Sequence, residues 1–188
     1  MATNRTIAHV NEQIAPESLV DFWGEYFPDG QIPAQTETIK PLPSNGEFYL
    51  EGHLLKAVEV GQSDTYNTTV LHVPDLDLVV TGDAVYGECF QYLVETNTAA
   101  LRAQWIRAVD EIKGLNPKIV VPSHKQAWDG FGTDHLENTK RFIENWATET
   151  EVATNASDLV ERIVKLYPKR IGDFILSISA AEVFSATT

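Results

Sequence analysis

The chain is poor in basic residues, in cysteine and in long apolar runs. Its 27 acidic residues outnumber 14 basic ones, so the 188 residues carry a net charge of −13. Nucleic acids and anionic membranes both attract basic surfaces, and we therefore expect neither as a partner. The single cysteine, Cys89, excludes a disulfide within the chain and is typical of a reducing compartment.

Signals for membranes and for export are scarce as well. No apolar run approaches the roughly 20 residues that span a bilayer. The first residues, Met1–Thr6, lack the apolar core of a secretory signal. We therefore expect a cytoplasmic protein that does not act at a membrane.

The apolar material that is present suffices for one core. Hydrophobic residues make up 43% of the chain, and no repeat, low-complexity tract or linker divides it. We expect a single domain over residues 1–188.

Hydrophobic periodicity and turn residues divide this domain into a strand-rich part and a helical part. The predicted strands are Phe48–Glu51, Leu54–Val60, Thr68–Val73, Leu76–Thr81 and Lys118–Pro122. The predicted helices are Ala8–Gln13, Pro16–Phe27, Thr96–Leu115, Asp134–Val152, Ser157–Tyr167 and Phe174–Phe184. Pro74-Asp75 predicts a tight hairpin between the third and fourth strands. The order predicts an α/β (α+β) fold in which helices cover a mixed sheet.

Two apolar, β-branched runs each end in a side chain that is suited to chemistry. The run Thr68–Asp83 ends in the carboxylate of Asp83, and the run Ile119–Lys125 contains His124. A carboxylate and an imidazole at the exits of neighbouring strands suit a metal site or a proton-transfer site. An Asp after a strand is also a common turn residue, so the pattern alone leaves a structural role open.

The order and wording of these runs resemble the C-terminal half of the metallo-β-lactamase superfamily. The resemblance covers about residues 47 to 130 and rests on Gly82-Asp83 and on Val120-Val-Pro-Ser-His124. It implies a truncated αββα sandwich. In the family, one or two metal ions, commonly zinc, lie between two sheets that helices flank.

The same resemblance implies that most metal ligands of the family are missing. The His-x-His-x-Asp-His motif does not occur in the chain, which we interpret as an N-terminal truncation, and Gln62 stands in place of a histidine. Asp83 and His124 keep the family's ligand types. Because catalytic zinc usually takes at least three protein ligands, we expect no cofactor. Zinc on Asp83 and His124, completed by other ligands or by another chain, is the alternative.

Without a metal, these two residues suit general acid–base chemistry. A buried carboxyl that lacks a cation tends to keep its proton, and a neighbouring imidazole can carry the matching one. We predict Asp83 and His124 as catalytic residues, with Tyr86 and Lys125 orienting a carbonyl or phenolate oxygen. The predicted substrate contacts are Gln62, Asp64, Tyr66, Phe90 and Trp128. Each aromatic side chain, taken singly, is also typical of a core.

Three functional hypotheses follow. The leading one is an enzyme of degenerate metallo-β-lactamase type that dehydrates, cyclises or isomerises a small polyketide-like or aromatic molecule without a metal. The second is a metal-dependent hydrolase of an ester, lactone or thioester. The third is a non-catalytic protein that binds a ligand or a partner.

A half sandwich leaves one apolar face of its sheet and one strand edge without a cover. We expect the helices after Asp134, or a second copy of the chain in a homodimer, to cover that face.

Overall fold

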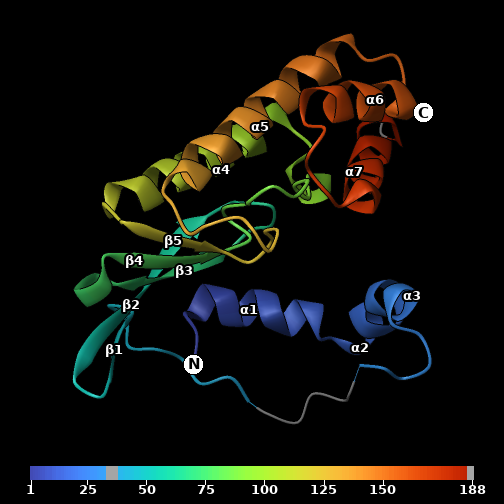
Figure 1. Cartoon of the computed structure of the whole chain (residues 1–188). Coiled ribbons are helices and arrows are strands. Elements are labelled where there is room, and N and C mark those ends of the chain that lie inside the picture. The colour runs from blue at the N-terminus through green and yellow to red at the C-terminus, as the bar shows by residue number, and fades with distance from the viewer. Residues whose placement is uncertain (33–37, 186–188) are drawn as a thin grey trace.

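The structure, a computed structural model, describes residues 1–32 and 38–185. Its centre is a mixed five-stranded sheet in the order β1-β2-β3-β4-β5 (Figure 1). The strands are β1 (Glu47–Leu50), β2 (His53–Gly61), β3 (Thr68–Val73), β4 (Leu78–Gly82) and β5 (Ile119–Pro122). Neighbours from β1 to β4 are antiparallel, whereas β5 runs parallel to β4. The predicted α/β (α+β) class with a mixed sheet is confirmed.

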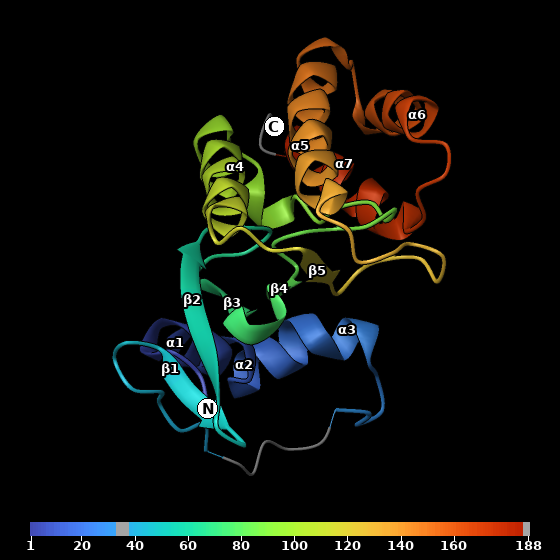
Figure 2. The same ribbon diagram turned by 60° about the vertical axis from the view of Figure 1, so that its left-hand side comes forward.

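The helices of the C-terminal part gather on one face of this sheet (Figures 1 and 2). They are α4 (Ala99–Gly114), α5 (Asp134–Val152), α6 (Ala156–Leu166) and α7 (Asp173–Ser185). The α4 helix joins β4 to β5, because parallel neighbours need a crossover connection. The bounds of α5 match the predicted helix, and those of the other three shift by at most three residues. Within the described ranges, no helix is both long and apolar enough to cross a membrane.

The core lies between the sheet and these helices. Alternate strand residues face the helices, and Val70, Val79 and Val120 are at most 1% exposed. Trp105 of α4 and Trp146 of α5 belong to the same buried cluster. Burial of an aliphatic or aromatic side chain of this kind contributes roughly 1.5–3 kcal/mol, so this layer is a main source of stability.

The N-terminal helices begin on the opposite face of the sheet, where the first of them lies, and continue past the end of the sheet (Figure 1). They are α1 (Asn4–Gln13), α2 (Pro16–Ser18) and α3 (Gly24–Tyr26), with a π-helical segment (Leu19–Trp23) joining the last two. Arg5 of α1 pairs with Glu59 of β2 at 3.5 Å, and the Thr6 hydroxyl contacts the Thr69 hydroxyl of β3 at 2.8 Å. Over β2 and β3, α1 therefore provides the cover that we had assigned to the helices after Asp134 or to a second copy.

The remainder of this face is partly open. Val80 of β4 and Ile119 of β5 are 38% and 36% exposed, and both point away from the buried row of strand residues. Apolar side chains on this side of the sheet were expected from a half sandwich, and α1 does not remove them all from solvent.

The connection between β3 and β4 is longer than the predicted tight hairpin. Pro74–Leu76 forms a 3₁₀ turn, and Asp77 follows in the left-handed region with φ +49°. Leu76 therefore belongs to the turn, and β4 begins at Leu78. The fixed φ of proline favours a helical turn here, and aspartate tolerates the left-handed conformation that closes it.

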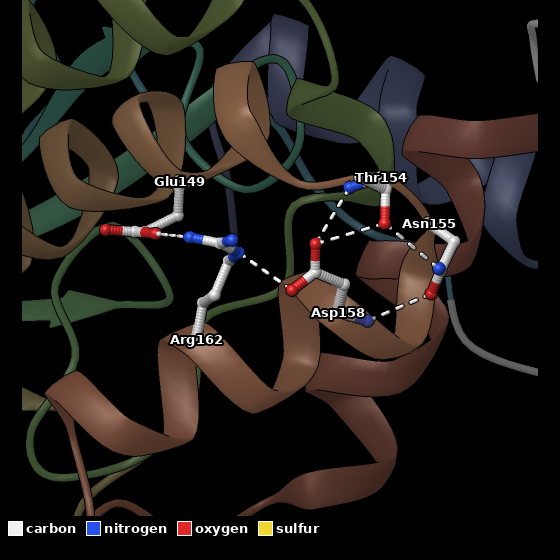
Figure 3. Close-up of polar contacts among 5 residues, drawn as sticks. All are labelled: Glu149, Thr154, Asn155, Asp158 and Arg162. Atoms are coloured by element: carbon white, nitrogen blue, oxygen red, sulfur yellow. Dashed lines mark hydrogen bonds and ion pairs between the residues drawn. The ribbon is translucent and has the colours of Figure 1, made fainter.

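A polar network stabilises the turn between α5 and α6 (Figure 3). Asn155 caps α6, because its side-chain oxygen accepts the N–H of Asp158 at 3.0 Å. The Asp158 carboxylate accepts the Thr154 N–H at 2.9 Å. Arg162 then links Asp158, at 2.8 Å, to Glu149 of α5, at 3.4 Å. These contacts satisfy the N–H of Asp158 in the first turn of α6 and link α6 to α5.

We expect Asn155→Ala to lower the free energy of unfolding by about 1 kcal/mol, because the first turn of α6 loses an acceptor. Denaturant unfolding followed by circular dichroism checks this. The exposed Ser157→Ala change is the control and should cost less than about 0.5 kcal/mol. Equal stability of the two variants would contradict the capping role.

Candidate active site

Two strands end at glycines that carry the chain out of the sheet. Gly82 closes β4 with φ +53°, and Gly61 closes β2 with φ +81°. Residues with a Cβ are strained at such angles, so glycine is favoured at both positions. The pairing register also shifts at these glycines. The residues that follow, Asp83 and Gln62, therefore leave the sheet at once.

Asp83, Ser123 and His124 form a cluster of contacts at a strand end. Nε2 of His124 lies 3.3 Å from Oδ1 of Asp83, and the Ser123 hydroxyl donates to the same carboxylate oxygen. The side chains of His124 and Asp83 are 57% and 44% exposed. Because β4 pairs in parallel with β5, Gly82 lies beside Pro122 and the two strand exits are neighbours. Asp83 approaches His124, as expected. We had also expected the Asp83 carboxylate to be buried, and it is not.

The helices α4 and α5 both bind the loop that follows Asp83. Trp105 of α4 donates its indole N–H to the Ala84 carbonyl at 2.8 Å, and Thr139 of α5 accepts the Tyr86 N–H at 3.0 Å. The Tyr86 ring is 3% exposed and stacks on the His124 ring, with centroids 5.2 Å apart. The imidazole therefore has a fixed aromatic wall on one side.

Asp64 is the buried carboxyl of this region. It is 7% exposed, and its Oδ1 accepts the Ser63 hydroxyl and the Thr65 N–H, both at 2.8 Å. The Tyr86 hydroxyl donates to its Oδ2 at 3.4 Å. Burial, followed by the nearby Asp83 carboxylate, raises the pKa of Asp64 from 3.8 to about 7, against the opposite effect of the two hydrogen bonds to Oδ1. Asp64 is therefore partly protonated at neutral pH.

The raised pKa of Asp64 makes stability fall as the pH rises. The folded carboxyl keeps its proton up to about pH 7, whereas the unfolded one releases it near pH 3.8. The folded state therefore binds the extra proton between these values. We expect Asp64→Asn to gain stability relative to the wild type as the pH rises from 3.8 to about 7. At higher pH the gain in the free energy of unfolding should be at most about 4 kcal/mol.

Thermal unfolding of both proteins from mildly acidic to mildly alkaline pH measures this difference. The exposed Asp21→Asn change is the matched control, and its profile should run parallel to that of the wild type. A parallel profile for Asp64→Asn would show that Asp64 ionises normally in the folded protein.

The amide nitrogen of Gln62 stabilises the loop after β2. Gln62 is 8% exposed, and its Nε2 donates to the Thr96 hydroxyl and to the Ser63 carbonyl, both at 3.1 Å. The Thr96 hydroxyl donates to the same carbonyl at 2.6 Å. The residue that we predicted as a substrate contact thus joins this loop to the 3₁₀ turn Val94–Thr96.

Two further predicted residues, Phe90 and Lys125, have contacts within the chain. Phe90 is 3% exposed and packs near Phe142, with ring centroids 6.2 Å apart, so it belongs to the core. The Lys125 ammonium donates to the carbonyls of Gln126, at 3.2 Å, and Asp129, at 2.9 Å. It therefore stabilises its own loop.

The last two predicted contacts, Tyr66 and Trp128, lie in different places. The Tyr66 ring stacks on His9 of α1 at 4.1 Å, and its hydroxyl donates to Glu12 of the same helix. It therefore holds α1 against the loop between β2 and β3. Trp128 is 73% exposed and lines a cavity to which neither Asp83 nor His124 contributes.

The donor set of this cluster does not fit a zinc site. Among the residues that the structure describes, no group of three or more His, Cys, Asp and Glu side chains is placed to hold a metal ion. Asp83 and His124 supply two donors. The Gln62 amide oxygen carries no charge and is a poor zinc ligand. Asp64 is 7% exposed, and its Oδ1 is bound to the Ser63 hydroxyl and the Thr65 N–H. Catalytic zinc usually needs a further protein ligand, so these residues by themselves would not hold it.

Sequence reasoning missed two residues that position the cluster. Ser123 precedes His124 at the same strand exit, so its position was a usable signal. Thr139 had none, because its contact with Tyr86 spans 53 residues of the chain.

The family sequence model of the metallo-beta-lactamase superfamily matches residues 6–124 of the chain. This chain belongs to the metallo-β-lactamase superfamily. The superfamily match extends over more than half of the chain and contains both Asp83 and His124. A search of curated proteins found no match.

Solved structures share the superfamily fold with this chain. A metallo-β-lactamase family protein from Thermus thermophilus aligns with 100% of this chain and 66% of its own length, with a TM-score of 0.64 and 12% identity. A β-lactamase domain protein from Burkholderia ambifaria aligns with 96% of this chain and 56% of its own, with a TM-score of 0.63 and 14% identity. Such low identities support the fold alone.

The chain is shorter than these relatives. A metallo-β-lactamase from Pontibacter korlensis, 18% identical, aligns with 56% of this chain and 48% of its own, at a TM-score of 0.47. The chain therefore spans about half to two thirds of the length of the superfamily structures that it matches.

Proposed function

We propose that this superfamily member is an enzyme that moves protons on a small organic molecule, with His124 and Asp83 and without a metal. The 3.3 Å contact between His124 Nε2 and Asp83 Oδ1 at an open strand end carries this proposal. An imidazole beside a carboxylate can take and return a proton near neutral pH. Dehydration, cyclisation or isomerisation of a polyketide-like or aromatic molecule needs only such steps.

The neighbours of the pair position it. Ser123 donates to the Asp83 carboxylate and orients it, while the buried Tyr86 ring supports one face of the imidazole. The Tyr86 hydroxyl is directed to Asp64 in the interior, so Tyr86 is a positioning residue. Substrate would reach His124 from solvent, to which 57% of its side chain is exposed.

Asp83→Asn and His124→Gln should each lower turnover about a hundredfold or more, because neither amide exchanges a proton at neutral pH. The double variant should be little worse than either single one, since the two residues act as a unit. Turnover on a panel of small lactones, thioesters and hydroxy acids is measured alongside the unfolding midpoint of the same samples.

His53 and Asp75 supply a matched control. They form another exposed histidine–aspartate pair, with Nδ1 of His53 2.8 Å from Oδ2 of Asp75. His53→Gln and Asp75→Asn should leave turnover unchanged. Full activity in a folded Asp83→Asn protein would remove Asp83 from the mechanism, and a loss of activity that only follows the folded fraction would assign it a structural role.

A metal-dependent hydrolase of an ester, lactone or thioester is the second candidate. The 3.3 Å separation of the His124 and Asp83 donor atoms favours it, because two ligands of one tetrahedral zinc lie about that far apart. Further ligands from outside the described residues, including another chain, would have to complete the site. The zinc would then act as a Lewis acid on the substrate carbonyl.

Metal content separates these two functions. We expect less than one zinc per chain in protein purified in the presence of zinc, because no group of three or more His, Cys, Asp and Glu side chains is placed to hold a metal among the described residues. Elemental analysis measures this, and turnover is compared before and after dialysis against a chelator. One tightly bound zinc per chain, lost together with activity, would contradict the metal-free mechanism and support the hydrolase.

The remaining expectations stay proposals. A non-catalytic protein that binds a ligand or a partner would show binding without turnover.

We also propose that the protein forms a homodimer in the cytoplasm. The partly exposed Val80 and Ile119 on the open face of the sheet, and the exposed Tyr49 and Leu50 on the edge strand β1, support a second copy as their cover.

A further inference from the structure

A cavity of about 470 Å³ lies apart from the proton-transfer pair, and none of Asp83, Tyr86 and His124 lines it. Its walls come from the loop after β5, from α5 and from the connection between α6 and α7, which lie on the same side of the protein (Figure 2). Pockets of roughly 300–1,000 Å³ are typical of small-molecule sites, so the volume suits a ligand of one or two rings.

Arg170 provides a cation in the wall of this cavity. Its guanidinium lies over the rings of Phe142, at 4.6 Å, and Tyr167, at 4.9 Å, and it donates to the Cys89 carbonyl at 2.6 Å. Burial lowers the pKa of Arg170 to about 10, which leaves it charged at neutral pH. No carboxylate of the described chain lies within 4.0 Å of its nitrogens.

Two more cations line the same cavity. Arg141 of α5 and Lys169 of the α6–α7 connection are exposed there, and neither forms an ion pair within residues 1–32 and 38–185. Acidic residues outnumber basic ones 27 to 14 in the chain, so a carboxylate partner would be easy to supply. These three cations form no ion pair within 4.0 Å and are therefore available to an anion that comes from outside the chain.

The acidic side chains of the lining limit the charge of that anion. Asp129 is engaged by the chain itself, because its Oδ2 accepts the N–H groups of Glu88 and Gln126, both at 2.8 Å. Glu88 and Asp134 also line the cavity and would repel a doubly charged group. A single negative charge, as on a carboxylate, matches this lining better than a phosphate.

Trp128 adds an aromatic surface to the site. It lines the cavity with 73% of the residue exposed, which is unusual for the largest apolar side chain. An exposed indole beside cations offers a stacking surface to a flat ligand.

We propose that the cavity between α5, the loop after β5 and the α6–α7 connection is a binding site for a small aromatic monocarboxylate. The carboxylate lies against Arg170, with Arg141 and Lys169 at the rim, and the ring stacks on Trp128. This site is independent of the proton-transfer chemistry at His124.

Calorimetric titration with benzoate and naphthoate tests the site, with benzamide and phenyl phosphate as neutral and dianionic comparisons. We expect saturable binding of the carboxylates, no saturable binding of benzamide and weaker binding of phenyl phosphate. Arg170→Gln should weaken naphthoate binding about tenfold to hundredfold, because a charge-assisted hydrogen bond is lost. Trp128→Ala should weaken it about threefold to tenfold.

Arg170 also packs on Phe142 and Tyr167, so Arg170→Gln is read only if its unfolding midpoint is retained. The exposed pair change Arg141→Gln with Lys169→Gln provides the second variant and should weaken binding at least about fivefold. Arg107→Gln on α4, exposed and away from the cavity, is the matched control and should have no effect. The proposal is overturned if neither carboxylate binds saturably at millimolar concentration, or if the Arg141 and Lys169 changes weaken binding no more than the control does.

Discussion

The parallel pairing of β4 with β5 is the constraint on which the candidate site depends. Antiparallel neighbours would place the carboxyl ends of these two strands at opposite ends of the sheet. Parallel neighbours bring both carboxyl ends to the same end of the sheet. Gly82 then lies beside Pro122, and Asp83 beside Ser123 and His124. The α4 crossover that makes this pairing possible also carries Trp105, whose indole bonds the Ala84 carbonyl and holds the loop after Asp83.

Burial distinguishes the two aspartates of this region. Asp83 is 44% exposed and meets a hydroxyl and an imidazole, whereas Asp64 lies 7% exposed behind Tyr86. The low dielectric around Asp64 raises its pKa to about 7, and the Asp83 carboxylate adds to that rise. A neutral Asp64 in turn avoids repulsion with Asp83. Tyr86 lies between the interior carboxyl and the surface pair, because it contacts both Asp64 and His124.

The two faces of the sheet have different covers, and both leave surface for binding. The C-terminal helices bury the middle of one face, where Val70, Val79 and Val120 pack in one core with Trp105 and Trp146. Where their connections meet the loop after β5, they enclose the cavity that Arg170 lines. On the other face, α1 binds β2 and β3 through polar contacts, and Val80 and Ile119 remain partly exposed. The proposed ligand site therefore lies on the helical side of the sheet, and the proposed contact between chains lies on the open side.

Much of the fold followed from the sequence alone, because its strands and helices have strong local signals. Alternating β-branched residues predicted β3, and the apolar spacing over Asp134–Val152 predicted α5 with its observed bounds. The approach of Asp83 to His124 also followed, since a parallel sheet aligns strand exits. The position of α1 was missed, because Thr6 and Thr69 carry no apolar pattern that would indicate their contact.

The roles of single side chains at the site were decided by tertiary structure. Composition and motif order determined the superfamily and the two chemically capable residues, because those properties are local to the chain. Whether an aromatic faces a ligand or the core depends on which distant residues pack around it. Phe90 meets Phe142 of α5, while Trp128 remains at the surface. Exposure likewise distinguishes Asp83 from Asp64, because the pKa of a carboxyl depends on the solvent and charges that the whole fold places around it.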